Sequence, residues 1–133
     1  MRNLWLFVVL FACSGFASAQ TPKEYPYESG NAFLRLCSVI EQVQRTNGEN
    51  QTGVGCVSYI AGFVDGVETG NLTTTVQMKP TTVPQPFCRP EGVENGQLVK
   101  IVLKYIRENP EDAHHSTGLV AMWAFQKAFP CSK

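Results

Sequence analysis

The apolar positions of the chain fall into four stretches with the three-to-four-residue spacing of an amphipathic helix. These stretches are 31–45, 54–68, 94–108 and 116–128. The third must end before Pro110, because the residue before a proline resists the α conformation. No alternation with a period of two and no internal repeat is present. The pattern therefore predicts an all-α fold, a small bundle of about four helices arranged as two helical hairpins.

Serine, threonine or asparagine stands where the first and last of these helices should begin, as expected of N-cap residues. Ser29 or Asn31 can cap the first helix, and Ser116 or Thr117 the last. The helical spacing also predicts which side chains of the first and last helices are buried in the core. They are Phe33, Leu36, Cys37, Ile40, Val43, Leu119, Val120, Trp123 and Phe125.

Two connecting segments differ in composition from the helices. Residues 46–53, TNGENQTG, have the composition of a turn or loop. Residues 72–87 are rich in threonine and contain Pro80, Pro84 and Pro86, which favours an extended or polyproline conformation. A connection of this length inside a compact domain is unusual and is often functional.

Glycines at 62, 66 and 70 recur every four residues in the second predicted helix and so share one face. A glycine inside a helix lowers stability by roughly 1 kcal/mol relative to alanine. A face without side chains lets another backbone approach closely. We therefore predict that this face packs against another helix of the same chain. A second copy of the protein is the alternative occupant, and Gly70 could instead be the C-cap.

The first nineteen residues have the three parts of a secretory signal peptide: Arg2, an apolar run over 4–12, and the cleavage sequence Ala17-Ser18-Ala19. A single mature domain, 20–133, should follow. The apolar run is too short to span a bilayer. A lipoprotein attached through Cys13 is the less favoured alternative, because Phe11 is bulky for that processing site. We expect a periplasmic protein that is not held in the membrane after cleavage.

Four cysteines lie beyond the predicted signal peptide, which in an exported chain indicates two disulfides with three conceivable pairings. Helices joined by short loops pack antiparallel, so the start of one lies near the end of the other. This layout predicts the pairs Cys37–Cys56 and Cys88–Cys131. Each should stabilise the fold by roughly 3–4 kcal/mol in the chain-entropy model.

Charge and side-chain chemistry argue against several classes of function. Once Arg2 is removed, ten Lys and Arg stand against eleven Asp and Glu without any basic run, so nucleic acid is not an expected partner. A catalytic cysteine paired with His114 or His115 would need a free thiol. The two adjacent histidines also lack the spacing of a zinc site. We expect no catalytic residues, no metal and no cofactor.

Three stretches together resemble one family. They are GCVSYIAGFVDG at 55–66, FCRPEGVENGQLVKIVLKYIRENPE at 87–111 and AFQKAFPC at 124–131. Their order is similar to that of the Rap/Tai immunity proteins of type VI secretion systems. The positions that match the motifs of this family are Cys88, Pro90, Gly92, Val93, Gln97, Leu98, Val99, Pro110, Phe129, Pro130 and Cys131.

The resemblance implies a small exported helical protein that binds and occludes a toxic effector, of which peptidoglycan amidases are one class. It also implies a homodimer as a further association. An inhibitor needs no chemistry of its own, in agreement with the missing catalytic constellation. We expect the contacts in two segments, with apolar anchors in the first and polar groups in the second: Val76, Met78 and Phe87, then Glu111, Asp112, His114 and His115.

Two other functions remain as alternatives. The first is a small periplasmic helical stress or chaperone-like protein without an effector partner. Such a holdase should expose apolar surface reversibly in mild acid, which dye binding would detect. The second is an enzyme, for which one free thiol beyond the signal peptide would be the sign.

Overall fold

The structure is a computed structural model that describes residues 27–78 and 83–132. Every regular element in these residues is helical, and the all-α prediction is confirmed. The elements are α1 (Gly30–Cys37), the 3₁₀ turn η1 (Ser38–Glu41), α2 (Asn47–Met78), α3 (Asn95–Glu108), the 3₁₀ turn η2 (Pro110–Asp112) and α4 (Thr117–Ala128). The predicted signal peptide, residues 1–19, lies outside the described residues, as does the side chain of Met78.

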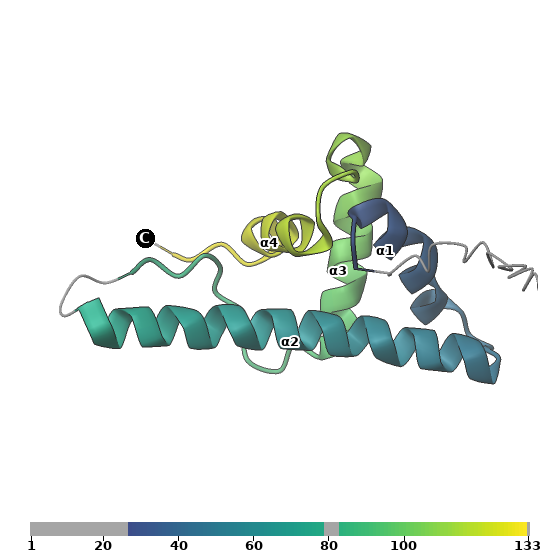
Figure 1. Cartoon of the computed structure of the whole chain (residues 1–133), viewed down its shortest axis with the longest axis horizontal. Coiled ribbons are helices and arrows are strands. Elements are labelled where there is room, and N and C mark those ends of the chain that lie inside the picture. The colour runs from purple at the N-terminus through teal and green to yellow at the C-terminus, as the bar shows by residue number, and fades with distance from the viewer. Residues whose placement is uncertain (1–26, 79–82, 133) are drawn as a thin grey trace, which may run out of the picture.

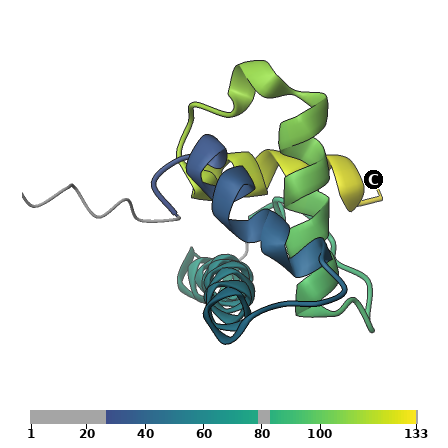
Figure 2. The ribbon, with the colours of Figure 1, turned by 90° about the vertical axis from the view of Figure 1, so that its right-hand side faces the viewer.

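Helix α3 is the centre of the arrangement, because the two most extensive helix–helix contacts, with α2 and with α4, are both made by it. Helix α2 runs along the lower edge of the molecule, and α3 stands across it (Figure 1). Turning the molecule shows α1 in front of α3 and α4, with α2 seen end-on below them (Figure 2). The body of the protein therefore stands over the part of α2 that lies below α3 and α1, while the C-terminal end of α2 extends past α4.

Helix α1 is shorter than the apolar spacing predicts. Ser29 caps it as expected, since its side chain accepts a hydrogen bond from the Ala32 amide at 3.2 Å. After η1, Gln42 adopts an extended conformation with φ −78° and ψ 140°, and this ends the helical run. Val43 is consequently 98% exposed, so its predicted place on the buried face is wrong.

Helix α2 begins seven residues earlier than predicted, at Asn47 rather than Val54, so residues 46–53 are not a loop. Thr46 and Glu49 form a capping box. The Glu49 carboxylate accepts bonds from the amide and hydroxyl of Thr46 at 2.7 and 2.8 Å, and the Glu49 amide donates to the Thr46 hydroxyl at 3.3 Å. These bonds satisfy amides that the first turn leaves without partners, which offsets the low helix propensity of Asn47 and Gly48.

At the C-terminal end of α2, the threonine-rich residues 72–78 are helical. The prediction that they are extended is therefore wrong. The hydroxyls of Thr73, Thr74 and Thr75 donate to backbone carbonyls one turn earlier, at 2.8–2.9 Å. Pro80, the first proline of the segment, stands beyond the last helical residue. Gly70 is thus inside the helix and is not its C-cap. The described residues after the gap, 83–90, are irregular.

Both predicted disulfides are confirmed. Cys37–Cys56 joins α1 to α2 with a Cα–Cα distance of 5.8 Å, and Cys88–Cys131 joins the segment before α3 to the one after α4 at 4.9 Å. The first bridge is inside the core, whereas Cys88 is exposed. The largest buried side chains of the core come from all four helices: Phe33, Ile60, Val64, Leu98, Val99, Val102, Leu103, Ile106, Val120 and Phe125.

Helix α4 buries a narrower face than predicted. Val120 and Phe125 are buried and Trp123 is half-buried, but Leu119 is 41% exposed. Adjacent residues of a helix point about 100° apart, so Leu119 and Val120 cannot both face the core of a helix packed on one side.

Candidate partner-binding surfaces

The described residues show no chemistry of a catalytic or metal centre. All their cysteines are in disulfides, so none provides a thiolate. No group of three or more His, Cys, Asp or Glu side chains in residues 27–78 and 83–132 is arranged to hold a metal ion. The surfaces that remain to be considered are therefore those that could contact another macromolecule.

The glycine face of α2 is open. Gly62, Gly66 and Gly70 are all exposed, and a Cβ atom added to any of them would have no neighbour within 4 Å among the described residues. The prediction that this face packs against another helix of the same chain is therefore wrong. The core is contacted instead by the opposite side of the helix, which carries Ile60 and Val64.

Residues 68–78 of α2 extend past α4 (Figure 1), and we call them the overhang. Leu72 and Val76 are 64% and 67% exposed there, so Val76 stands where the sequence analysis placed an apolar contact. Two shallow grooves, of about 390 and 250 Å³, run between the overhang and the irregular residues 83–89. At the base of the overhang Arg89 binds Glu68 through two hydrogen bonds of 3.1 and 3.2 Å, which hold the irregular segment against α2.

Phe87 was grouped with Val76 as an apolar contact, but the structure places its side chain in the core. It is 5% exposed and packs on Phe125, with ring centroids 5.3 Å apart. A side chain buried in this way cannot contact a partner in this conformation, so we do not retain Phe87 among the contact residues. Met78, the third member of the group, has a side chain outside the described residues.

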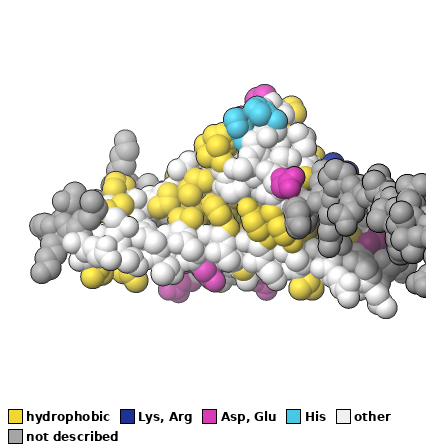
Figure 3. Space-filling model, viewed as in Figure 1, with side chains coloured by type: hydrophobic (Ala, Val, Ile, Leu, Met, Phe, Trp, Pro, Cys, Tyr) yellow, Lys and Arg dark blue, Asp and Glu magenta, His cyan; other side chains and the backbone are white. Residues whose placement is uncertain are grey.

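The second predicted segment forms a turn after α3, and its two histidines stand at the top of the molecule (Figure 3). Tyr105 donates a 2.8 Å hydrogen bond to Asp112. Burial, together with this bond and the Asp112 charge, raises the pKa of Tyr105 to about 12. The His114 ring nitrogen Nδ1 lies 2.7 Å from the Glu111 carbonyl oxygen, and the half-buried His115 ring packs edge-on against Trp123 at 5.2 Å.

These contacts divide the second segment in two. Asp112 and His115 are half-buried and pack within the fold, whereas the side chains of Glu111 and His114 are exposed, although the His114 ring also contacts the Glu111 carbonyl. Backbone bonds from the amides of Gly30 and Asn31 to the carbonyls of His115 and Ala113 tie the turn to α1. The turn and the overhang lie at different ends of the view, so the fold does not bring the two predicted contact segments together (Figure 1).

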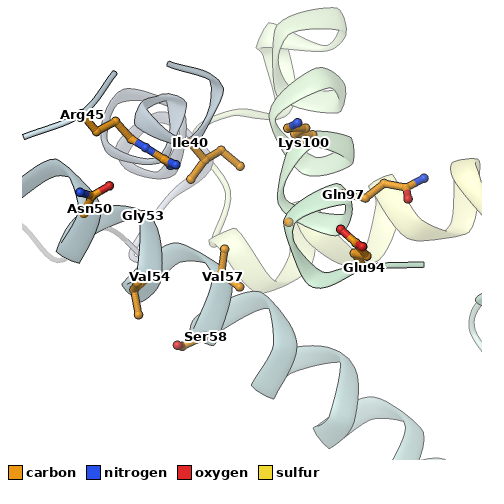
Figure 4. A pocket seen from close by; sticks show the side chains of 11 residues that line it. Ile40, Arg45, Asn50, Gly53, Val54, Val57, Ser58, Glu94, Gln97 and Lys100 are labelled. Atoms are coloured by element: carbon orange, nitrogen blue, oxygen red, sulfur yellow. The ribbon is translucent and has the colours of Figure 1, made fainter. Parts of the chain in front are cut away.

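A cleft that the sequence analysis did not predict lies at the other end of α2, and we call it the α1–α3 cleft. It has a volume of about 760 Å³. It is bounded by residues after α1, by the first turns of α2 and by the first turns of α3 (Figure 4). Its lining residues are Ile40, Arg45, Asn50, Gly53, Val54, Val57, Ser58, Glu94, Gly96, Gln97 and Lys100.

No local signal marked this cleft because its residues come from three segments that are far apart in the sequence. Gly53 alone hints at it. A Cβ atom there would lie 3.4 Å from Ile40 Cγ2 and 3.5 Å from an Arg45 guanidinium nitrogen, which is ordinary contact distance. The first turns of α2 therefore lie against the chain after α1, a contact that only the tertiary structure reveals.

Comparison with known proteins agrees with the resemblance seen in the motifs. Residues 29–131 match the family described as Rap1a immunity proteins. Because this match covers most of the chain, the protein belongs to that family. Neither a curated protein nor a solved structure matches it.

Proposed function

We propose that this Rap1a immunity protein acts in the periplasm, where it binds and occludes a toxic effector delivered by type VI secretion, of the peptidoglycan amidase class. The observation that carries the proposal is the family match over residues 29–131. An inhibitor that acts by occlusion needs a rigid surface and no reactive group. A disulfide-stapled helical domain with exposed apolar residues on a projecting helix supports such a role.

The periplasmic location is supported by two features of the chain. Residues 1–19 have the sequence pattern of a cleaved signal peptide. Disulfides also form and persist in oxidising compartments such as the bacterial periplasm. Among the helices of the described residues, none is both long and apolar enough to cross a membrane.

For the contact with the effector we propose two surfaces. The overhang offers Leu72 and Val76, which are exposed on a helix that extends past α4 and could enter the substrate groove of an enzyme. The turn after α3 offers Glu111 and His114 for a polar contact. Interfaces combine apolar anchors with polar groups around them in this way.

We also propose that the outward face of α2 supports a homodimer. Its glycines have no neighbour within 4 Å among the described residues, so a second helix could approach the backbone closely.

The test is to express residues 20–133 in an oxidising compartment and to capture partners from a periplasmic and secreted extract. Captured hydrolases are then purified and assayed for the release of peptides from peptidoglycan, with and without the protein. A stoichiometric partner that loses its activity on binding is the expected result. Leu72→Glu with Val76→Glu should weaken binding, whereas the same change at Gln51, an exposed α2 position outside the overhang, should not.

An empty capture from an extract in which secreted hydrolases are detectable would contradict the proposal. In that case the stress-protein alternative would be favoured, and dye binding in mild acid would test it. Light scattering of the free protein tests the homodimer separately. A monomer at all concentrations that support effector binding would rule the homodimer out.

A further inference from the structure

The α1–α3 cleft has an apolar floor and a polar rim, which is the usual character of a site that holds a ligand. Ile40, Val54 and Val57 provide aliphatic surface from two sides, and Val54 is 65% exposed although it is a large apolar side chain. Figure 4 shows Ile40 between the Arg45 side chain and Lys100, above the helix that carries Val54 and Val57. The cleft could therefore bury an apolar side chain while a charged group lies beside it.

The cations of the cleft differ from the other cations of the described residues. Arg89, Lys104, Arg107 and Lys127 each form an ion pair with a glutamate. Arg45 and Lys100 form no ion pair and no hydrogen bond within the described residues, and both line this cleft. The charge of Arg45 acts on the Glu49 carboxylate, and the charge of Lys100 acts on the Glu41 carboxylate, without a hydrogen bond in either case. The hydrogen bonds of Glu49 come from Thr46, and those of Glu41 come from Arg107.

The remaining charges of the lining do not neutralise these cations. Glu94 is the one carboxylate among the lining residues, against the two cations. It precedes α3 as its N-cap but makes no side-chain capping bond, so it leaves amides of the first turn free. The positive end of the α3 dipole adds to the field on this side of the cleft.

From this combination we infer that the α1–α3 cleft binds a short acidic and apolar peptide segment of the effector. Carboxylates of that segment would pair with Arg45 on one side of Ile40 and with Lys100 on the other. An aliphatic or aromatic side chain between those carboxylates would cover Ile40, Val54 and Val57. The inference rests on the proposed immunity function for the identity of the partner. The chemistry of the ligand rests on the cleft alone, through charge complementarity and apolar contact.

The first test uses a synthetic probe and does not need the effector. An amidated peptide of sequence Asp-Leu-Asp-Phe-Asp is titrated into the oxidised chain from Gln20 and followed by amide nitrogen–proton correlation spectra. Gly53 and Gly96 line the cleft, and their resonances should shift, while those of Gly66 and Gly118 outside it should not. The matching Asn-Leu-Asn-Phe-Asn peptide should bind about tenfold more weakly or worse, and added salt should weaken the acidic peptide.

A matched pair of variants separates the cleft from net charge. Arg45→Glu with Lys100→Glu should abolish the peptide shifts, whereas Lys104→Glu with Lys127→Glu, which changes net charge equally outside the cleft, should leave them in place. Arg45→Gln with Lys100→Gln replaces the first variant if its thermal unfolding shows a damaged fold. Equal binding of the acidic and neutral peptides, or shifts that survive loss of both cations, would overturn the inference.

The second test uses the captured effector. The cleft variant should bind it about tenfold more weakly or worse, and the control variant as well as wild type. Unchanged inhibition by the cleft variant would overturn the inference while the immunity function stands. If no effector is captured, the proposed function fails, and the probe peptide still decides whether the cleft binds acidic segments.

Discussion

The two parts of α2 belong to one continuous helix yet are stabilised differently. In residues 47–67 an apolar stripe containing Cys56, Ile60 and Val64 is fully buried against the rest of the protein, and a capping box closes the first turn. In the overhang, Leu72 and Val76 are largely exposed, and threonine hydroxyls donate to backbone carbonyls. The first part is held by tertiary packing and the second mainly by bonds within the helix itself.

This contrast separates residues that stabilise the fold from residues that are free to bind a partner. An exposed aliphatic side chain in the overhang adds little to folding, because it removes little apolar surface from water. The end of a helix that extends beyond the core with few buried apolar contacts is also the part that opens most easily. The following predictions test this division, from the largest expected effect to the smallest.

Truncating an apolar side chain should lower the stability of the protein much more in the first part of α2 than in the overhang. Ile60→Ala should lower the free energy of unfolding by about 2–5 kcal/mol, because it leaves a cavity in the core. Leu72→Ala in the overhang should change it by less than about 0.5 kcal/mol. Chemical denaturation of both variants measures the two values. A large loss for Leu72→Ala would mean that the overhang packs against something, such as a second copy.

Alanine at the glycines of α2 should distinguish open from occupied positions. Gly66→Ala should stabilise the protein by roughly 1 kcal/mol, since the new methyl group meets open space and alanine favours the helix. Gly55→Ala should gain less, because its Cβ would lie 2.7 Å from the Tyr27 hydroxyl and the Tyr27 side chain, which stacks on Tyr59, would have to shift. Thermal unfolding compares the two variants.

The Gly66 experiment also tests the homodimer. If wild type is a dimer and a bulkier variant, Gly66→Leu, is a monomer of unchanged stability, the open face is the dimer interface. If both variants remain in the wild-type oligomeric state, the face is free of a second copy.

The Arg89–Glu68 ion pair should stabilise the base of the overhang by less than about 1 kcal/mol, since both side chains are partly exposed and screened by solvent. A double-mutant cycle with Glu68→Gln and Arg89→Gln gives the coupling energy. Amide hydrogen exchange in residues 68–78 should become faster in either variant, while exchange around Ile60 stays the same. Equal acceleration in both regions would show that the two parts of α2 do not open separately.

The smallest predicted effect is a dependence of the first turn of α2 on pH. Hydrogen bonds from the Thr46 backbone and hydroxyl lower the pKa of Glu49 below its ordinary value of 4.5. A lowered pKa means that this stabilisation is present above pH 4.5 and is lost as the pH falls through the lower value of the folded state. Exchange of the amides in the first turn should therefore accelerate in acid. Glu49→Gln should remove that dependence, and its persistence would assign it to another carboxylate.

The all-α class, the positions of α3 and α4 and both disulfide pairs could be predicted from local signals. Apolar spacing, a proline after α3 and four cysteines beyond a predicted signal peptide were sufficient, because each depends on nearby residues or on a simple hairpin layout. The family could also be recognised from ordered motifs. The length of α2 was misjudged because composition suggested a loop and an extended segment, although the Thr46–Glu49 capping pattern was visible.

The surfaces available to a partner were decided by tertiary packing. Glycine spacing and an apolar residue such as Phe87 look the same in a sequence whether they face the core or water. The direction in which α2 packs left its glycines open, and the packing of the segment before α3 on Phe125 buried Phe87. Arg45 and Lys100 both line the α1–α3 cleft, although they are more than 50 residues apart in the sequence. Helical periodicity fixes which residues share a face, but which face is buried depends on the neighbours that the fold supplies.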